Sequence, residues 1–275
     1  MPTFTTPSPI TATLTTAGAR VRVTAGERSD TVVRVEPVDG ASRTDVKVAE
    51  GTRVDFADGV LSIRTTKSGG KNGSVAIAID LPAGSDLVLD TAWTDVHASG
   101  PLGACDVNTA SGHVRLDRIT ALRGNLAGGG VEVTHVAGAV EVDGGTAGLR
   151  LHEVDGTVRY QGTTGAVWIG HARSDVDLGG SNGTFTVDRA DGDVTAQAAN
   201  CPIRVGRTTR GNVALTNASG GIEIGVSENT AAAVDAKSTK GTVHNTLPAQ
   251  ENRADTLKVY ARARLDDIVI RPAAA

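Results

Sequence analysis

An apolar–x–apolar motif that recurs every nine residues is the feature that most constrains the fold of this chain. Alternate side chains of a β-strand share one face, so each copy predicts a short strand with its apolar side chains inward. Glycine often precedes the motif by two residues, as at Gly129 and Gly156, which is typical of a tight corner. The first apolar positions from residue 131 onward are Val131, Val140, Leu149, Val158, Val167, Val176, Phe185, Val194 and Ile203.

Odd and even copies of the motif differ, and the difference doubles the period. Five positions after Leu149 stands the apolar Val154, whereas five positions after Val158 stands the polar Thr163. The repeat is therefore eighteen residues with two strands. This pattern predicts an all-β fold, a parallel β-solenoid (β-helix) with about eighteen-residue coils and two short strands per coil.

In a parallel solenoid, residues eighteen apart are vertical neighbours, so Val140, Val158 and Val176 should lie on adjacent strands. The outward positions then form ladders in which charge alternates, which avoids like-charged neighbours. One ladder reads Arg123, Glu141, Arg159 and Asp177, and the other reads Arg115, Glu132 and Arg150.

The ends of the chain depart from this period. Residues 1–80 alternate like longer strands, with Ala57-Asp58-Gly59 as a hairpin turn, and predict a β-rich cap of antiparallel strands. Residues 81–271 form the predicted solenoid domain. Near its far end we expect a mobile polar loop from Pro248 to Asp255, followed by a last strand that closes the stack. No helix of note is predicted.

Charge and hydropathy exclude several classes of function. The formal net charge is −4 with both signs interspersed, and no Lys/Arg run interleaves with aromatic residues, so no nucleic-acid partner is expected. No stretch is long and apolar enough for a membrane span. Without a signal-peptide pattern at Met1–Ile10, we expect a cytoplasmic location, with the cell surface as the alternative. Cys105 and Cys201 lie too far apart in the predicted stack for a disulfide.

Four short segments carry a family resemblance. They are Thr109-Ala110-Ser111-Gly112-His113-Val114, Asn217-Ala218-Ser219-Gly220-Gly221-Ile222, Ser238-Thr239-Lys240-Gly241-Thr242-Val243 and the closing Asp267-Ile268-Val269-Ile270. Across residues 75–271 the chain resembles a bacterial family of unknown function labelled "putative adhesin", built from β-strand repeats, although Asp266 stands where its closing motif has glycine. The resemblance implies a β-solenoid and no known enzymatic activity.

Two carboxylates one coil apart, Asp175 and Asp193, are the best candidates for chemistry. Stacked carboxylates could bind a cation or act as an acid/base pair. The favoured interpretation is that they are corner residues whose side chains accept hydrogen bonds from the turn backbone. No lysine or arginine stands in an obvious position to serve as a base beside them.

His135, Glu153 and His171 occupy one slot in successive odd coils and raise a zinc hypothesis. Strands are about 4.8 Å apart, so the two histidines lie nearly twice that distance apart at the backbone. A solvated polar ladder is the favoured interpretation. Trp168 points outward from an odd strand, where it could anchor a partner, stack on a sugar or lie under a neighbouring loop.

We therefore expect a non-enzymatic scaffold or protein-interaction module that binds another protein or associates with itself through its flank or ends. No cofactor or metal is expected. One alternative is an adhesin-like or carbohydrate-binding surface protein, although a sugar-binding face normally carries more aromatics than this one. The other is a glycan-active β-helix enzyme that uses Asp175 and Asp193.

Overall fold

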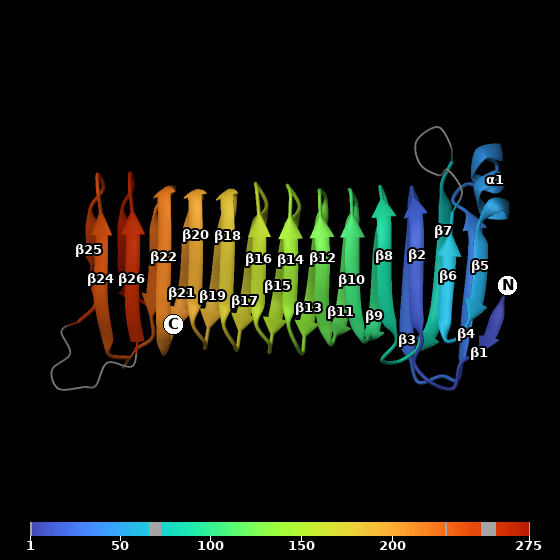
Figure 1. The fold of residues 1–275 in the computed structure, drawn as a ribbon, viewed down its shortest axis with the longest axis horizontal. Coiled ribbons are helices and arrows are strands. Elements are labelled where there is room, and N and C mark those ends of the chain that lie inside the picture. Colours follow the sequence, from blue (N-terminus) through green and yellow to red (C-terminus); the bar gives the residue numbers. More distant parts are fainter. Residues whose placement is uncertain (1, 66–72, 229, 249–256, 275) are drawn as a thin grey trace. The chain divides into compact units, whose positions relative to one another are not determined.

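A computed structural model describes residues 2–65, 73–228, 230–248 and 257–274 of the chain. Most of these residues lie in β-strands (Figure 1). Contacts divide the chain into two units, Met1–Ala137 and Gly138–Ala275, and each is described by itself. The two inward apolar positions of each copy of the motif bury one face of each short strand.

The first unit contains thirteen strands and the only helix among the described residues. One of its sheets has the order β1-β4-β7-β3-β9-β11-β13, and the other has the order β12-β10-β8-β2-β6-β5. The strands are β1 (Thr3–Thr5), β2 (Thr11–Ala17), β3 (Ala19–Gly26), β4 (Asp30–Pro37), β5 (Arg53–Ala57), β6 (Val60–Arg64), β7 (Val75–Pro82), β8 (Asp86–Ala92), β9 (Asp95–Pro101), β10 (Ala104–Thr109), β11 (His113–Ile119), β12 (Ala121–Leu126) and β13 (Gly130–Val136).

The predicted antiparallel cap is only partly correct. Antiparallel pairing is confined to β1 with β4, β4 with β7 and β5 with β6. The β5–β6 hairpin turns at Asp58 and Gly59, both with positive φ, as the sequence predicts. In contrast, β2 and β3 form a parallel coil that lies between the β6–β7 coil and the β8–β9 coil. The predicted domain division at residue 80 stays a prediction, and β7 continues through it.

The helix α1 (Arg43–Gly51) was not predicted. The Ser42 hydroxyl accepts the Asp45 N–H at its amino end, and Asp45 also accepts the backbone N–H groups of Asp39 and Ser74. These hydrogen bonds hold the pKa of Asp45 below its ordinary value, with the Ser74 N–H contributing most. Only Asp45 and Val48 are buried, so the helix carries almost no apolar period for a sequence to reveal.

The second unit contains the remaining strands. One sheet has the order β15-β17-β19-β21-β23-β27-β25, and the other has the order β24-β26-β22-β20-β18-β16-β14. The strands are β14 (Val140–Gly144), β15 (Gly148–Val154), β16 (Val158–Gly162), β17 (Ala166–Ala172), β18 (Val176–Asn182), β19 (Thr184–Ala190), β20 (Val194–Asn200), β21 (Ile203–Thr208), β22 (Gly211–Ser219), β23 (Ile222–Val226), β24 (Ala232–Ser238), β25 (Val243–Asn245), β26 (Leu257–Ala263) and β27 (Ile268–Pro272).

The eighteen-residue stacking is confirmed. Val140 pairs with Val158, and Val158 pairs with Val176, on adjacent parallel strands. The same register places Arg159 between Glu141 and Asp177, as the ladder predicts. The extra residue that the sequence shows before Val213 lengthens one coil, because Val194 pairs with Val213. The fold is therefore a β-solenoid whose coils tolerate single insertions at their corners.

The far end of the second unit corrects one prediction. The last coil of the chain, β26–β27, does not close the stack; it lies between the β22–β23 coil and the β24–β25 coil. The earlier β24–β25 coil is the terminal one in both sheets. Apart from Pro248, the predicted loop Pro248–Asp255 lies outside the described residues.

The core of each unit is a layer of inward Val, Leu, Ile and Ala side chains. In the second unit the two sheets meet at Tyr160 and Phe185, whose ring centroids lie 6.1 Å apart at an edge-to-face angle of 82°. Cys105 and Cys201 are both buried, and neither forms a disulfide. Cys105 thus occupies the inward position that the repeat assigns to it.

Glycine at the corners serves close approach between coils. Gly129 has a φ of 87°, and a Cβ there would lie 2.0 Å from the Gly112 carbonyl oxygen one coil away. At Gly156 φ is not positive, yet a Cβ would lie 2.3 Å from the carbonyl of Gly138. The corner glycines that the sequence shows are therefore required mainly because the backbones of stacked corners touch.

Candidate functional site

The outward face of β15, β17, β19 and β21 in the second unit carries three of the predicted site residues, Trp168, Glu153 and His171. Strand alternation turns Leu149, Val167, Phe185 and Ile203 inward and the following residues outward. The register therefore places Arg150, Trp168, Thr186 and Arg204 in one row across the strands. We call this row and its neighbours on the same four strands the Trp168 face.

Trp168 is half-buried and held on three sides. The Arg150 guanidinium lies 4.6 Å from the centroid of the indole ring, and the His152 ring meets it edge-to-face at 5.1 Å. The indole Nε1–H donates to Asp188 Oδ2 at 3.1 Å. These contacts fix the ring orientation while part of the ring stays in contact with solvent. Neighbours on the same face therefore contribute to its partial burial.

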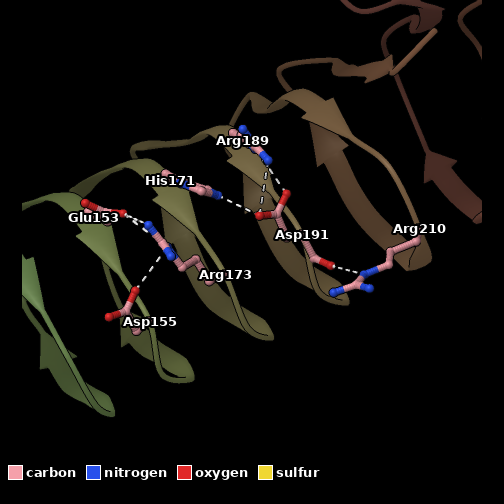
Figure 2. A network of polar contacts seen from close by, with 7 residues as sticks. All are labelled: Glu153, Asp155, His171, Arg173, Arg189, Asp191 and Arg210. Carbon is pink, nitrogen blue, oxygen red and sulfur yellow. Dashed lines mark hydrogen bonds and ion pairs between the residues drawn. The ribbon is translucent and has the colours of Figure 1, made fainter.

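Glu153 and His171 lie further along the same strands, and the register pairs them as vertical neighbours, as predicted. Their side chains do not converge; each pairs instead with a turn residue one coil away (Figure 2). Glu153 Oε1 accepts Arg173 Nε at 3.1 Å, and His171 Nε2 lies 2.7 Å from Asp191 Oδ2. Both pairs are separated by twenty residues, one coil plus two positions.

This offset makes a diagonal network that reaches from Glu153 and Asp155 to Arg210, across four coils (Figure 2). Arg173 also lies 3.1 Å from Asp155, and Arg189 Nε donates to Asp191 Oδ1 at 3.0 Å. Arg210 Nε donates to the backbone carbonyl of Asp191 at 3.0 Å. Sequence reasoning missed Arg173 and Asp191 because it followed the vertical period of eighteen alone.

The pKa of the Asp191 carboxyl lies below its ordinary value. Partial burial acts to raise the pKa, but the hydrogen bonds from His171 and Arg189, together with their positive charge, outweigh it. The Arg173 guanidinium has a raised pKa, chiefly because of its hydrogen bond to Glu153. The network therefore consists of ion pairs between arginines and carboxylates, together with the His171–Asp191 hydrogen bond.

His135 belongs to the first unit, where its register neighbour on β11 is Arg118. Across the parts of the chain that the structure describes, no three His, Cys, Asp or Glu side chains gather closely enough to hold a metal ion. The zinc hypothesis for His135, Glu153 and His171 therefore gains no geometric support.

Asp175 and Asp193 occupy stacked corners, and each carboxylate accepts a backbone N–H from the next coil. Asp175 Oδ1 accepts Asp193 N–H at 2.9 Å, and Asp193 Oδ1 accepts Asn212 N–H at 2.8 Å. The Asn212 side-chain amide adds a hydrogen bond of 2.9 Å to Asp193 Oδ2. These hydrogen bonds lower the pKa of Asp193, and the one from the Asn212 side chain contributes most. The corner interpretation of both residues therefore has geometric support.

The same hydrogen bond from a corner aspartate to the backbone of the next coil recurs in the first unit. There, Asp86 accepts the Ala104 N–H at 2.7 Å and Asp95 accepts the His113 N–H at 3.1 Å. A corner aspartate is thus a repeated structural device and not a peculiarity of one place.

Trp93 was not singled out from the sequence, because it lies in a corner and outside the strand motif. It connects β8 to β9 with a φ of 48°, an uncommon conformation for a residue other than glycine, and 72% of it is exposed. Its backbone N–H donates to the Ser111 hydroxyl at 3.2 Å. The structure shows no side-chain partner for the indole among the described residues, so Trp93 differs from the braced Trp168.

No helix in the described ranges is long and apolar enough to cross a bilayer. No curated protein matches the sequence.

The chain is similar to three solved structures of low sequence identity. A "putative adhesin" from Parabacteroides merdae shares 11% identity at a TM-score of 0.40, with 97% of this chain and 94% of that chain covered. A "putative adhesin" from Parabacteroides distasonis shares 12% identity at a TM-score of 0.45, with 98% and 95% covered. One from Bacteroides fragilis shares 10% identity at a TM-score of 0.31, with 98% and 95% covered.

The sequence profile of one family, described as Toastrack DUF4097, matches residues 12–269, which is nearly the whole chain. The chain belongs to the Toastrack DUF4097 family.

Proposed function

We propose that this β-solenoid is a non-catalytic protein-interaction module and that the Trp168 face is the surface it presents to another protein. The observation that carries the proposal is the bracing of Trp168 by Arg150, His152 and Asp188. A side chain that is already ordered loses little conformational entropy when a partner covers it. Tryptophan and arginine are also the residues most enriched among those that dominate binding energy.

The surroundings of Trp168 fit such a role. Thr186 and Arg204 continue its row, and Arg204 is oriented by Glu223 at 3.7 Å. Parallel strands about 4.8 Å apart give the face a regular, closely spaced set of side chains. The diagonal ion pairs around His171 and Arg173 border it. An aromatic centre within a polar border is the usual composition of a protein-binding patch.

The non-catalytic part of the proposal rests on how the polar groups are used. The carboxylates of Asp175 and Asp193 accept backbone N–H groups of the next coil. A general acid or base needs a pKa near the working pH, whereas the pKa of Asp193 is shifted downward, away from neutrality. Asp193 is therefore poorly suited to the acid/base role of the glycan-active alternative, and the Asp175 carboxylate is engaged by the Asp193 N–H.

Quantitative co-purification from the source cells tests the proposal, with the whole chain immobilised as wild type, Trp168→Ala or Trp93→Ala. We expect a protein that is retained by the wild type and by Trp93→Ala and depleted about thirtyfold or more by Trp168→Ala, the effect of losing an interfacial hot spot. Cross-linking from a photoreactive residue at Thr186 should capture the same protein. Equal recovery by all three chains would remove the Trp168 face from the proposal.

Two further measurements separate the alternatives. Sedimentation of the purified chain tests self-association, which Trp168→Ala should abolish if a second copy is the occupant. A glycan array together with cell fractionation tests the adhesin-like alternative: Trp168-dependent glycan binding by a surface-located chain would replace the protein-binding proposal, whereas recovery in the cytoplasmic fraction would support it.

A further inference from the structure

A groove of about 700 Å³ lies on the outward face of the first unit, over β7. Its floor is formed by Ala76 and Ala78, whose small side chains sit between longer side chains of β4 on one side and β3 on the other. The register places Arg34 and Glu36 along the β4 wall and Arg20 and Arg22 along the β3 wall.

The charges in this groove are unevenly compensated. Arg34 pairs with Asp80 at 2.5 Å, and Arg115 pairs with Glu132 at 3.4 Å. In contrast, Arg20 and Arg22 are exposed and form no ion pair within the described parts of the chain. Arginine side chains on this face are otherwise matched with acids, so the two β3 arginines stand out as available cations.

Two acidic residues also line the groove, and neither satisfies these arginines. Asp95 neighbours Arg20 in register, but its Oδ1 accepts the His113 N–H at 3.1 Å and lies 3.6 Å from His113 Nδ1. Glu36 lies on the opposite wall, across Ala76. Beyond Arg22 the row continues with His97 and then Arg115, which extends the basic character along the groove.

The spacing of the two arginines selects a kind of ligand. Arg20 and Arg22 are alternate residues of one strand, so they share a face and lie about 6.6 Å apart along it. Alternate side chains of an extended peptide have the same spacing. Two carboxylates at such positions could therefore meet the two guanidinium groups one to one. Arginine forms its strongest hydrogen bonds with carboxylates and related oxyanions.

We propose that this groove binds an extended acidic peptide segment of another protein, with carboxylates at alternate residues against Arg20 and Arg22 and the peptide backbone over Ala76 and Ala78. Both edges of β7 are already paired, by β3 and β4, so recognition is made by side chains and not by addition of a strand. The site lies on a different unit from Trp168, and either proposal can fail without the other.

Fluorescence anisotropy with the whole chain tests the assignment. The probe is a labelled peptide of alternating threonine and glutamate, and the comparison peptide has the same composition with the glutamates in one block. We expect the alternating peptide to bind roughly fivefold more tightly, because only its carboxylates match the arginine spacing. Raising NaCl from about 20 to about 200 mM should weaken both.

Variants locate the binding. Arg22→Gln and Arg20→Gln should each weaken the alternating peptide about tenfold, and Ala78→Glu should do the same by filling and neutralising the groove. Arg64→Gln is the matched control, since it removes one exposed arginine from the other sheet of the same unit and should leave the affinity unchanged. Melting curves confirm that each variant folds.

Equal affinity for the two peptides, or equal loss with Arg64→Gln and Arg22→Gln, would overturn the proposal in favour of general electrostatic attraction. Heparin, single-stranded DNA and inorganic phosphate serve as competitors. If any of them binds more tightly than the alternating peptide and depends on Arg22, the peptide assignment is wrong and the groove binds that other anion.

Discussion

Asp193 receives two hydrogen bonds from Asn212, one from the backbone N–H at 2.8 Å and one from the side-chain amide at 2.9 Å. The pair links two consecutive corners of the second unit where the coil is lengthened by one residue, since Val194 pairs with Val213. Asp193 thus holds a corner whose backbone departs from the regular repeat.

Asp193→Ala should lower the free energy of unfolding by about 1 kcal/mol, because it leaves the Asn212 N–H without its acceptor. Asp193→Asn keeps an acceptor oxygen and should lose less. Urea unfolding at neutral pH measures both. Asp177→Ala is the control, since Asp177 is an exposed side chain of β18. A loss in the control equal to that of Asp193→Ala would show that the corner bonds contribute nothing special.

The His171–Asp191 pair predicts a pH-dependent contribution to stability. The pKa of Asp191 is lower in the folded chain than its ordinary value of 3.8, so the folded state favours the carboxylate. Its stabilisation is fully present above that ordinary value and is lost as the pH falls through the folded pKa. At pH 7, Asp191→Asn should lower the free energy of unfolding by about 1 kcal/mol.

Urea titrations measure the free energy of unfolding from pH 7 down to about pH 2.5. The difference in this free energy between wild type and Asp191→Asn should become smaller below the ordinary carboxyl pKa. Asp177→Asn is the control substitution, since Asp177 is an exposed side chain of β18 for which the structure shows no hydrogen bond or ion pair among the described residues. A difference for Asp191→Asn that stayed constant across the whole range would mean that the charge of this carboxylate is not what stabilises the network.

Tyr160 offers a stabilising substitution. Its side chain is 1% exposed, and its hydroxyl is buried without a hydrogen-bond partner within the described residues. Burial raises the pKa of this phenol. Removing an unsatisfied buried hydroxyl relieves a desolvation cost, so Tyr160→Phe should raise the free energy of unfolding by up to about 1 kcal/mol.

Thermal or urea unfolding measures the effect, with Tyr260→Phe as the control because Tyr260 is 46% exposed. The control should change little. A clear destabilisation by Tyr160→Phe would reveal that the hydroxyl makes a hydrogen bond in solution after all.

The two cysteines should be inert in the folded protein. Burial, with a smaller contribution from the Asp86 charge, raises the pKa of Cys105 to about 12. Burial raises the pKa of Cys201 to about 11, although a backbone hydrogen bond from Phe185 opposes it. Thiolates are the reactive species, so both residues should resist Ellman's reagent at pH 8 and react once the chain is unfolded in urea. Rapid labelling of native Cys105 would show that its unit opens readily.

Much of the fold could be predicted because a solenoid repeats one local rule. The nine-residue spacing that placed Val140, Val158 and Val176 in register also located the inward side chains. The exchanged order of β26–β27 could not be predicted, because the apolar pattern of a coil is the same wherever it stacks. Helix α1 was missed because only Asp45 and Val48 in it are buried, although Ser42 and Asp45 carry its capping signal.

Of the candidate site, only the pairing of residues eighteen positions apart could be predicted from the sequence. The register of Glu153 with His171 follows from the period. Their true partners, Arg173 and Asp191, lie two positions beyond it, where the chain leaves the strand and the side chains reach diagonally. The contacts of Trp168 with its neighbours depend on the directions of their side chains, which the repeat spacing does not specify.

The placement of β26–β27 inside the stack has a consequence for synthesis. When the ribosome has made Asn245, the β24–β25 coil lacks the neighbour on which it will finally rest, since that neighbour comprises residues 257–272. Until those residues emerge, β22 and β24 each offer an unpaired edge of the kind that recruits strands from other chains. A premature stop in this stretch would leave the β22 edge and the inner edge of β24 open, so translation to the end of β27 is what pairs them.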